Sequence, residues 1–303
     1  MKRVLGVVEG KSGGPLIILL GGLHGNEVAG IKAINKVLQV IHQNQVPING
    51  TLVGLAGNLQ ALASNRRFIG YDLNRCWTED FINRVYHQQH TQAEDIELKD
   101  LHQIIMEFKN HEYQKRLLID LHSTSSEQGN FVVVPGSEAM NPVVQSLQQP
   151  VVIDLDQYLS GTLLKYLYGQ GFFSLAFEGG LIGSPEAIEL NVSGIWRMLE
   201  ASGAIGSAHI NGSMKSGKKV RSFSRLPNFV KVRYHHKISE LDKFVMHPGF
   251  ANFQRIKAGQ LVASDRNGPV YAPVSGLMFL PLYQSSGDDG FFIVEEVSIM
   301  EAY

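Results

Sequence analysis

The chain is poor in cysteine and nearly balanced in charge, and each of these features excludes a class of protein. Cys76 is the only cysteine among 303 residues, which excludes an internal disulfide and a CxxC metal knuckle. A single cysteine also fits a reducing compartment. The formal net charge is −1, from 27 Lys and Arg against 28 Asp and Glu. Nucleic-acid binding is therefore disfavoured, because neutralising phosphates needs a basic surface.

Long apolar runs are also absent. The apolar stretch near the N-terminus, Val4 to Val8, is too short for the core of a signal peptide. No run approaches the roughly 18 apolar residues of a membrane-spanning helix. The hydrophobic share of 44% and charged share of 18% are ordinary for a globular protein. We therefore expect a cytoplasmic protein with no membrane partner.

Apolar strand-like segments alternate with amphipathic segments over the first two thirds of the chain. Strands are expected at residues 4–8, 15–20, 51–56, 117–121, 131–134 and 172–177. Helices are expected at about residues 27–43, 58–63, 94–110, 141–149, 159–168 and 185–201. This alternation predicts an α/β fold, with a mixed, largely parallel sheet flanked by helices.

The composition changes after about residue 200. Residues 202–218 are rich in Gly and Ser, which is typical of a linker or surface loop. Only short strand-like segments follow, at residues 229–234, 259–263, 270–273, 276–282 and 291–297. We expect a first domain over residues 1–205 and a small all-β domain over residues 206–303.

Three of the expected strands end in polar side chains that a core does not need. His24 and Glu27 follow the second strand, His122 follows a central strand, and Glu178 follows a later one. Because the ends of parallel strands meet at one edge of a sheet, these residues are expected to converge. Two imidazoles and one carboxylate, here His24, Glu27 and His122, can hold one catalytic Zn²⁺. Glu178 would then be free to accept a proton from water and return it to a leaving amine.

The irregular segment 65–75 is rich in Arg and Asn. Arg67 could polarise a substrate carbonyl group, and Arg75 with Asn74 could bind a substrate carboxylate. Asp72 is expected to hold this loop in place. A small acidic substrate with an acyl bond to cleave is therefore indicated.

Each of these residues also has a purely structural interpretation. A His-x-x-Glu pair often occurs by chance. A single histidine after a strand is more often a half-buried, hydrogen-bonded residue, and Glu178 could be an exposed turn residue. The arginines could form a solvated loop. These interpretations weaken because the residues recur at strand ends in one region.

Four segments, GGLHGNE, DLNR, DLHST and FEGG, occur in the order found in a known family. The chain resembles the succinylglutamate desuccinylase/aspartoacylase family, relatives of the zinc carboxypeptidases. The resemblance covers roughly residues 16–200 and implies a carboxypeptidase-like fold with one zinc ion per chain. By motif, it implies the following roles: zinc ligands His24, Glu27 and His122; water-activating Glu178; carbonyl-polarising Arg67; and substrate-carboxylate residues Asn74 and Arg75.

The C-terminal region carries a second resemblance. Gly259 to Leu261, followed by Ala272 to Gly276, resembles the barrel-sandwich hairpins of biotinyl and lipoyl domains, but the modifiable lysine is absent. The resemblance implies that this region walls the entrance to the active site.

Two departures from aspartoacylases concern the substrate. No arginine occurs between Gln157 and Phe177, where those enzymes place an additional one, and Tyr283 is a loose candidate for their C-terminal tyrosine.

Three hypotheses follow for function. The first is a zinc-dependent hydrolase that cleaves the amide bond of a small, acidic N-acyl amino acid, such as an N-acetyl- or N-succinyl-amino acid. The second is a carboxypeptidase-type metallopeptidase that acts on a short peptide. The third is a binding protein without catalysis, although such a protein would not need Glu178. The sequence leaves the acyl group, the amino acid and assembly into a homo-oligomer open.

Overall fold

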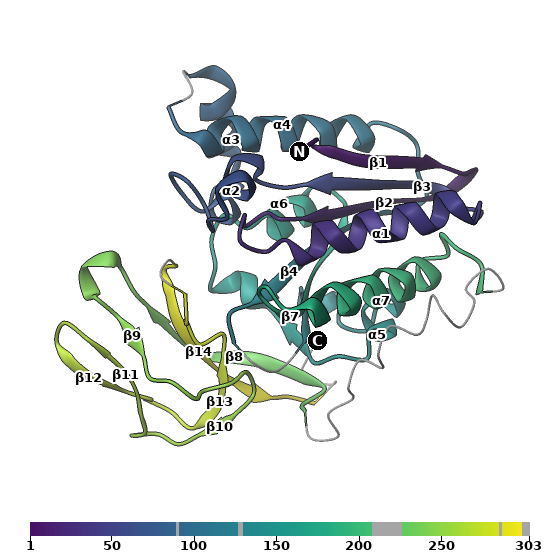
Figure 1. The fold of residues 1–303 in the computed structure, drawn as a ribbon. Coiled ribbons are helices and arrows are strands. Elements are labelled where there is room, and N and C mark those ends of the chain that lie inside the picture. The colour runs from purple at the N-terminus through teal and green to yellow at the C-terminus, as the bar shows by residue number, and fades with distance from the viewer. Residues whose placement is uncertain (89–90, 127–129, 208–225, 285–286, 299–303) are drawn as a thin grey trace.

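A computed structural model describes residues 1–88, 91–126, 130–207, 226–284 and 287–298 of the chain. Figure 1 shows its helices and strands. The helices are α1 (Ala29–Gln43), α2 (Leu59–Ser64), α3 (Glu79–His87), α4 (Ala93–Lys109), α5 (Pro142–Ser146), α6 (Leu163–Gly169) and α7 (Pro185–Ala201). The strands are β1 (Val4–Glu9), β2 (Lys11–Gly21), β3 (Asn49–Ala56), β4 (Arg116–Thr124), β5 (Phe131–Val134), β6 (Val151–Ile153), β7 (Phe173–Leu181), β8 (Phe229–Lys237), β9 (Val245–Met246), β10 (Arg255–Ile256), β11 (Leu261–Asp265), β12 (Gly268–Tyr271), β13 (Gly276–Phe279) and β14 (Asp289–Glu296).

One long sheet runs through the described part of the chain. Its order is β1-β3-β2-β4-β7-β5-β6-β8-β14-β13-β10. The pairs β3-β2, β2-β4 and β4-β7 at its centre are parallel, whereas β7-β5 and all pairs beyond β8 are antiparallel. The structure thus confirms the predicted mixed α/β sheet with flanking helices.

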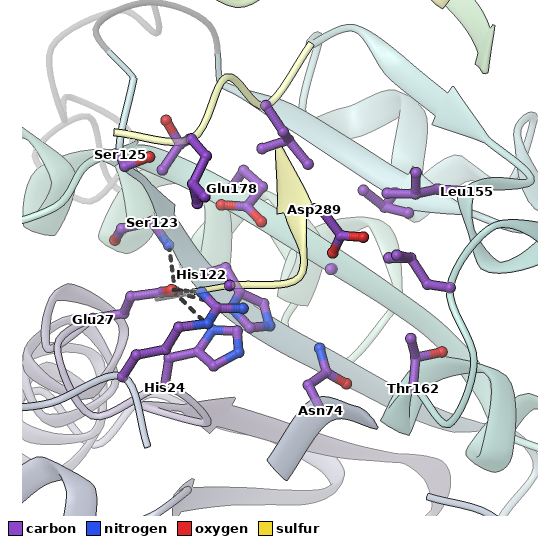
Figure 2. A pocket seen from close by; sticks show the side chains of 18 of the residues that line it. His24, Glu27, Asn74, His122, Ser123, Ser125, Leu155, Thr162, Glu178 and Asp289 are labelled. Carbon is purple, nitrogen blue, oxygen red and sulfur yellow. Dashed lines mark hydrogen bonds and ion pairs between the residues drawn. The ribbon is translucent and has the colours of Figure 1, made fainter. Parts of the chain in front are cut away.

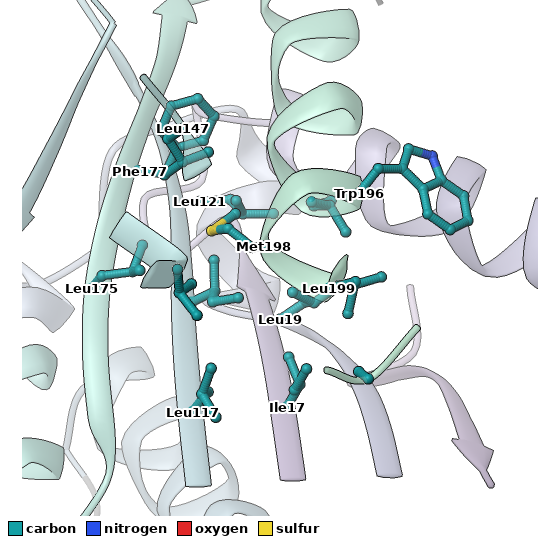
Figure 3. Packing of buried hydrophobic residues seen from close by; sticks show 14 of the residues in the cluster. Ile17, Leu19, Leu117, Leu121, Leu147, Leu175, Phe177, Trp196, Met198 and Leu199 are labelled. Carbon is teal, nitrogen blue, oxygen red and sulfur yellow. The ribbon is translucent and has the colours of Figure 1, made fainter. Parts of the chain in front are cut away.

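Side chains alternate between the two faces of the central strands and build a core on each side. On one face, Ile17 and Leu19 of β2 pack with residues of α1, α5 and α7, including Trp196 (Figure 3). On the other face, Leu16, Ile18 and Leu20 pack with residues of α3, α4 and α6. Because helices cover both faces of the sheet, the side chains on both faces of β2 are apolar, as expected for a parallel strand.

The sequence interpretation missed helix α3 and the short strands β6, β9 and β10. α3 was not predicted, although Thr78 caps its first turn by accepting a hydrogen bond from the backbone N–H of Phe81. β6 was also missed, because three residues are too few to show a period. The predicted Gly- and Ser-rich linker begins differently: Ala204 and Ile205 are buried in the core beside α7. The rest of that linker, from residue 208 on, lies outside the described residues.

The C-terminal strands form the small all-β region that the sequence predicted, and they pair with one another in antiparallel fashion. β8 and β14 extend the main sheet, whereas β12, β11 and β9 form a separate three-stranded sheet (Figure 1). The main sheet is continuous from β6 into β8, so backbone hydrogen bonds join the two expected domains. Their boundary at residue 205 stays a prediction. Within the described residues, no helix has the length and apolar character needed to cross a membrane.

Candidate metal and active site

Three neighbouring strands end at one cavity. His24 and Glu27 lie on the loop after β2, His122 lies near the end of β4, and Glu178 lies on β7. β4 runs between β2 and β7, and His122 is the direct register partner of Glu178. The structure therefore brings these four residues to one cavity, which all of them line (Figure 2). Their functional roles stay predictions.

A close approach of two loops fixes the position of His24 and Glu27. A Cβ atom on Gly25 would lie 2.1 Å from the backbone carbonyl carbon of Ala61, so only glycine fits there. The backbone N–H of Gly25 also donates to the carbonyl oxygen of Arg67 at 3.1 Å. The turn that presents the two side chains is thus tied to the loop that carries the arginine.

Glu27 joins the two histidines. Its Oε1 lies 2.9 Å from Nδ1 of His24, and its Oε2 lies 2.9 Å from Nδ1 of His122. The backbone N–H of Ser123 donates to Oε2 at 3.0 Å. All three side chains are buried, and one ligand atom from each lies within 4.8 Å of the other two. Among the described residues, this is the one group of His, Cys, Asp or Glu that could hold a metal ion.

Each imidazole has a second carboxylate behind it. Nε2 of His24 lies 3.1 Å from Oδ1 of Asp72, and Nε2 of His122 lies 2.8 Å from Oδ2 of Asp120. A carboxylate accepts a hydrogen bond from Nε2–H and so leaves the Nδ1 lone pair for a metal. Asp120 is placed for this because residues two apart on β4 point to the same face.

The charges around the histidines suit a divalent cation. Three carboxylates (Glu27, Asp72 and Asp120) contact the histidines. Among the described residues, Arg67 is the one guanidinium that contacts these carboxylates, which leaves two negative charges. Burial by itself would lower the pKa of His122, but Asp120 and Glu27 outweigh burial and raise it well above its ordinary value. A metal ion at Nδ1 would replace that proton, so the donor set and the charge both fit Zn²⁺.

Glu27 and Glu178 are carboxyl groups with opposite properties. Burial alone would raise the pKa of Glu27, but the charges and hydrogen bonds of His24 and His122 hold it below its ordinary value. Burial raises the pKa of Glu178 to about 7, although the charge of His122 opposes this. Oε2 of Glu178 has no hydrogen-bond partner among the described residues. Glu27 is thus held as an anion, whereas Glu178 can exchange a proton near neutral pH.

The loop that carries Arg67 is held by two acidic residues. Asp72 Oδ2 accepts hydrogen bonds from Nε and Nη2 of Arg67, at 3.1 and 2.8 Å. The buried Glu94, in the first turn of α4, accepts from the backbone N–H groups of Ile69, Gly70 and Tyr71. Asp72 therefore holds the loop, as the sequence indicated, and also contacts His24.

Asn74 and Arg75 also line the cavity. Oδ1 of Asn74 accepts from the backbone N–H of Leu163 at 2.9 Å, so its amide NH₂ group is the part left to meet a ligand. Nη2 of Arg75 donates to Oδ2 of Asp289 at 2.7 Å. Oδ1 of Asp289 in turn lies 2.7 Å from Nε2 of His235, on β8. The predicted carboxylate-binding arginine is therefore already paired with a carboxylate of the protein.

Tyr283 is the one candidate that the structure does not bring to the cavity. Its neighbours Leu282 and Gln284 line the cavity, whereas Tyr283 itself does not. The Tyr283 hydroxyl instead donates to the carbonyl oxygen of His247 and accepts from the N–H of Phe250. Tyr283 therefore holds a loop of the C-terminal region.

Sequence interpretation missed three residues of the site: Asp120, Glu94 and Asp289. The alternation Asp-Leu-His before the end of β4 could have pointed to Asp120. An acidic residue in the first turn of a helix is too common to single out Glu94. Asp289 had no local signal, because it reaches the site from a strand 214 positions away from Arg75.

The sequence profile of the succinylglutamate desuccinylase/aspartoacylase catalytic domain matches residues 13–170, more than half of the 303 residues. The chain belongs to the succinylglutamate desuccinylase/aspartoacylase family. This confirms the resemblance drawn from the four motifs. Three of those motifs lie inside the matched segment, whereas Glu178 lies beyond it.

Curated members of the family are distant relatives. A succinylglutamate desuccinylase of Ectopseudomonas mendocina is 29% identical over 162 residues, which cover 51% of this chain and 46% of that protein. A probable aspartoacylase of Acaryochloris marina is 32% identical over 125 residues, which cover 41% of this chain and 40% of that protein. Each alignment thus spans less than half of the relative.

Solved structures of the family share the fold. A succinylglutamate desuccinylase/aspartoacylase from Rhodobacter sphaeroides superposes with a TM-score of 0.68 at 17% identity, covering 96% of this chain and 88% of that one. The succinylglutamate desuccinylase from Chromobacterium violaceum gives a TM-score of 0.66 at 18% identity, covering 95% and 86%. At these identities, the likeness establishes the fold alone.

Proposed function

We propose that the protein is a zinc-dependent hydrolase that cleaves the amide bond of a small N-acyl amino acid. One arrangement carries the proposal: two imidazoles, each backed by a carboxylate, share Glu27 beside a second glutamate, Glu178, with a pKa raised to about 7. A site that only binds metal does not need that second glutamate. The names of the relatives, desuccinylase and aspartoacylase, indicate the removal of acyl groups and support the same reaction class.

In this proposal, His24, Glu27 and His122 hold one zinc ion per chain. When bound, zinc supplies Lewis acidity, which polarises a carbonyl group and makes water more nucleophilic near neutral pH. Glu178 accepts the proton of the attacking water and returns it to the leaving amine. Arg67 donates to the carbonyl oxygen as negative charge develops there. Arg75 and Asn74 bind the carboxylate of the substrate.

If the protein were a metallopeptidase, its cavity would have to admit a peptide chain. Part of the cavity wall comes from the C-terminal region, through Leu280, Leu282 and Gln284. This wall favours a small substrate over a peptide. Cytoplasmic location and assembly into oligomers stay predictions of the sequence.

A hydrolysis panel tests the proposal. The protein is freed of metal with a chelator, and release of free amine is measured with and without added Zn²⁺. The panel holds N-acetyl-amino acids, N-succinyl-amino acids and short peptides with a free C-terminus. We expect zinc-dependent turnover of N-acyl amino acids. Turnover of the peptides alone would favour the metallopeptidase, and turnover unchanged by chelation would refute the zinc mechanism.

A further inference from the structure

Both arginines of the cavity are already neutralised by protein carboxylates. Arg67 is paired with Asp72 through two hydrogen bonds, and Arg75 is paired with Asp289 at 2.7 Å. The Arg75 and Asp289 side chains are only 22% and 17% exposed, so water screens their interaction weakly. No lysine is found among the described residues that line the cavity. A second negative charge on a substrate would thus find no unpaired Lys or Arg side chain among the described residues of the lining.

The rest of the cavity wall is largely apolar. The apolar side chains come from both halves of the chain and include Val133, Leu155, Leu159, Leu164, Leu282 and Phe292. Phe292 and Leu155 are buried, and Leu159 is half-buried at the wall. Burying a carboxylate against such a wall without a partner costs several kcal/mol in general. An apolar group there would instead gain from leaving water.

We propose that the cavity selects N-acyl amino acids with a single carboxylate and an apolar remainder, and that Asp289 enforces this selection. This inference rests on the proposed function. The carboxylate of the substrate shares Arg75 with Asp289, and the apolar part lies against the leucine and phenylalanine wall. Figure 2 shows the Asp289 carboxylate directed into the same cavity as Glu178 and the histidines. Asp289 repels any additional carboxylate that would approach Arg75.

The proposal is tested with zinc-loaded protein and four probes. They are N-acetylmethionine, N-acetylaspartate, N-succinylglutamate and N-acetylornithine, which differ in charge beyond the α-carboxylate. We expect kcat/KM of the wild-type protein for N-acetylmethionine to exceed that for N-acetylaspartate by tenfold or more. The variant Asp289→Asn should narrow this gap roughly tenfold, through a gain on the two multiply charged anions. Asn keeps the shape of Asp and can still accept a hydrogen bond from His235.

Two further variants serve as controls for the effect of Asp289→Asn. Asp242→Asn removes one negative charge from a partly exposed position of the C-terminal region, where Asp242 lies 3.8 Å from Arg266, and should leave the substrate order unchanged. Leu159→Arg places a cation on the apolar wall and should raise kcat/KM for N-acetylaspartate even if Asp289→Asn does not fold. Thermal unfolding of each variant reports on folding.

Isothermal titration of the same probes separates this proposal from the proposed function. If no probe is hydrolysed, the function fails, yet tighter binding of N-acetylmethionine than of N-acetylaspartate still supports the selection. A wild-type preference for either multiply charged anion, in turnover or binding, would overturn it. A preference for N-acetylornithine would refute the claim that the cavity selects an apolar side chain. An equal effect of Asp289→Asn on all four probes would make Asp289 a structural residue only.

Discussion

The two ends of the cavity are built in different ways. At the metal end, His24, Glu27, His122 and Glu178 come from the ends of three adjacent strands, whose hydrogen-bonded register fixes their separation. At the proposed substrate end, Arg75 is the last residue of a short 3-10 turn, Leu73–Arg75, and its partner Asp289 starts a strand of the C-terminal region, 214 positions later. The proposed chemistry thus depends on residues of neighbouring sheet strands, whereas the proposed selection depends on contact between distant segments. Changes at the metal end should therefore alter kcat, and changes at the substrate end should alter KM.

The largest effect is expected from removing a metal ligand. His122→Ala deletes one of the three proposed zinc ligands and leaves Asp120 without its partner, so it should abolish stoichiometric zinc binding and turnover. Elemental analysis and a deacylation assay measure both. His102→Ala, a histidine bonded to Tyr86 and Tyr166 instead, should keep both. One zinc per chain in His122→Ala would overturn the ligand set.

Glu178→Gln should separate metal binding from chemistry. The amide cannot accept the proton of water, so kcat should fall about 10²–10⁴-fold while zinc content stays at one per chain. Asp156→Asn is a matched control. Asp156 also lines the cavity, but its ion pair is with Lys165 and not with a histidine, so this variant should keep its kcat. Full activity in Glu178→Gln would show that the base is another residue.

The raised pKa of Glu178 predicts how the stability of the chelated protein depends on pH. Well below pH 4.5 the Glu178 carboxyl is protonated in both the folded and the unfolded state, so it does not lower the free energy of unfolding. As pH rises toward 7, the unfolded state ionises first, so the wild-type protein loses stability relative to Glu178→Gln. The rise from 4.5 to about 7 corresponds to at most about 3 kcal/mol.

Urea unfolding of both proteins at pH 5 and pH 8 measures this difference. Titration of His122 is common to both proteins and cancels to first order. A stability difference that stays constant between the two pH values would contradict the raised pKa.

Asp120→Asn should weaken zinc binding less than His122→Ala does. Asn can no longer hold Nε2–H of His122 with a charged acceptor, so zinc affinity should fall about 10–100-fold. Competition with a fluorescent chelator measures the affinity. Asp156→Asn again serves as the control, and an unchanged affinity in Asp120→Asn would show that the contact with His122 is only structural.

The smallest effect is expected at the substrate end. Arg75→Ala should raise KM for an N-acyl amino acid about tenfold and change kcat little, since a charged hydrogen bond to the substrate is lost. Steady-state kinetics also include the matching N-acyl amine, which lacks the carboxylate. An equal rise in KM for both compounds would mean that Arg75 supports the fold through Asp289.

Much of the metal end could be predicted from the sequence, because its residues follow apolar strands directly. The run Pro15 to Leu20 and the segment ending in His122 are each readable as buried strands, and parallel strand ends meet at one edge. α7 was predicted with the bounds that the structure has, since Ser184 caps it and Pro185 begins it. α3 was missed because its nine residues lie between polar segments and show only two and a half turns.

The amino-acid sequence by itself determined the α/β fold, the family and the order of the residues proposed to hold zinc, because all of these follow from local patterns of apolar and polar residues. Only the tertiary structure decided that Asp72 and Asp120 stand behind the two histidines, that Tyr283 bonds to the loop of His247 and Phe250 and does not line the cavity, and that Asp289 meets Arg75. The physical reason is that packing between segments far apart in the chain sets the contacts of Asp72, Tyr283 and Asp289, and such packing leaves no signal in the neighbouring residues. Asp120 differs, because it lies two residues before His122 on the same strand.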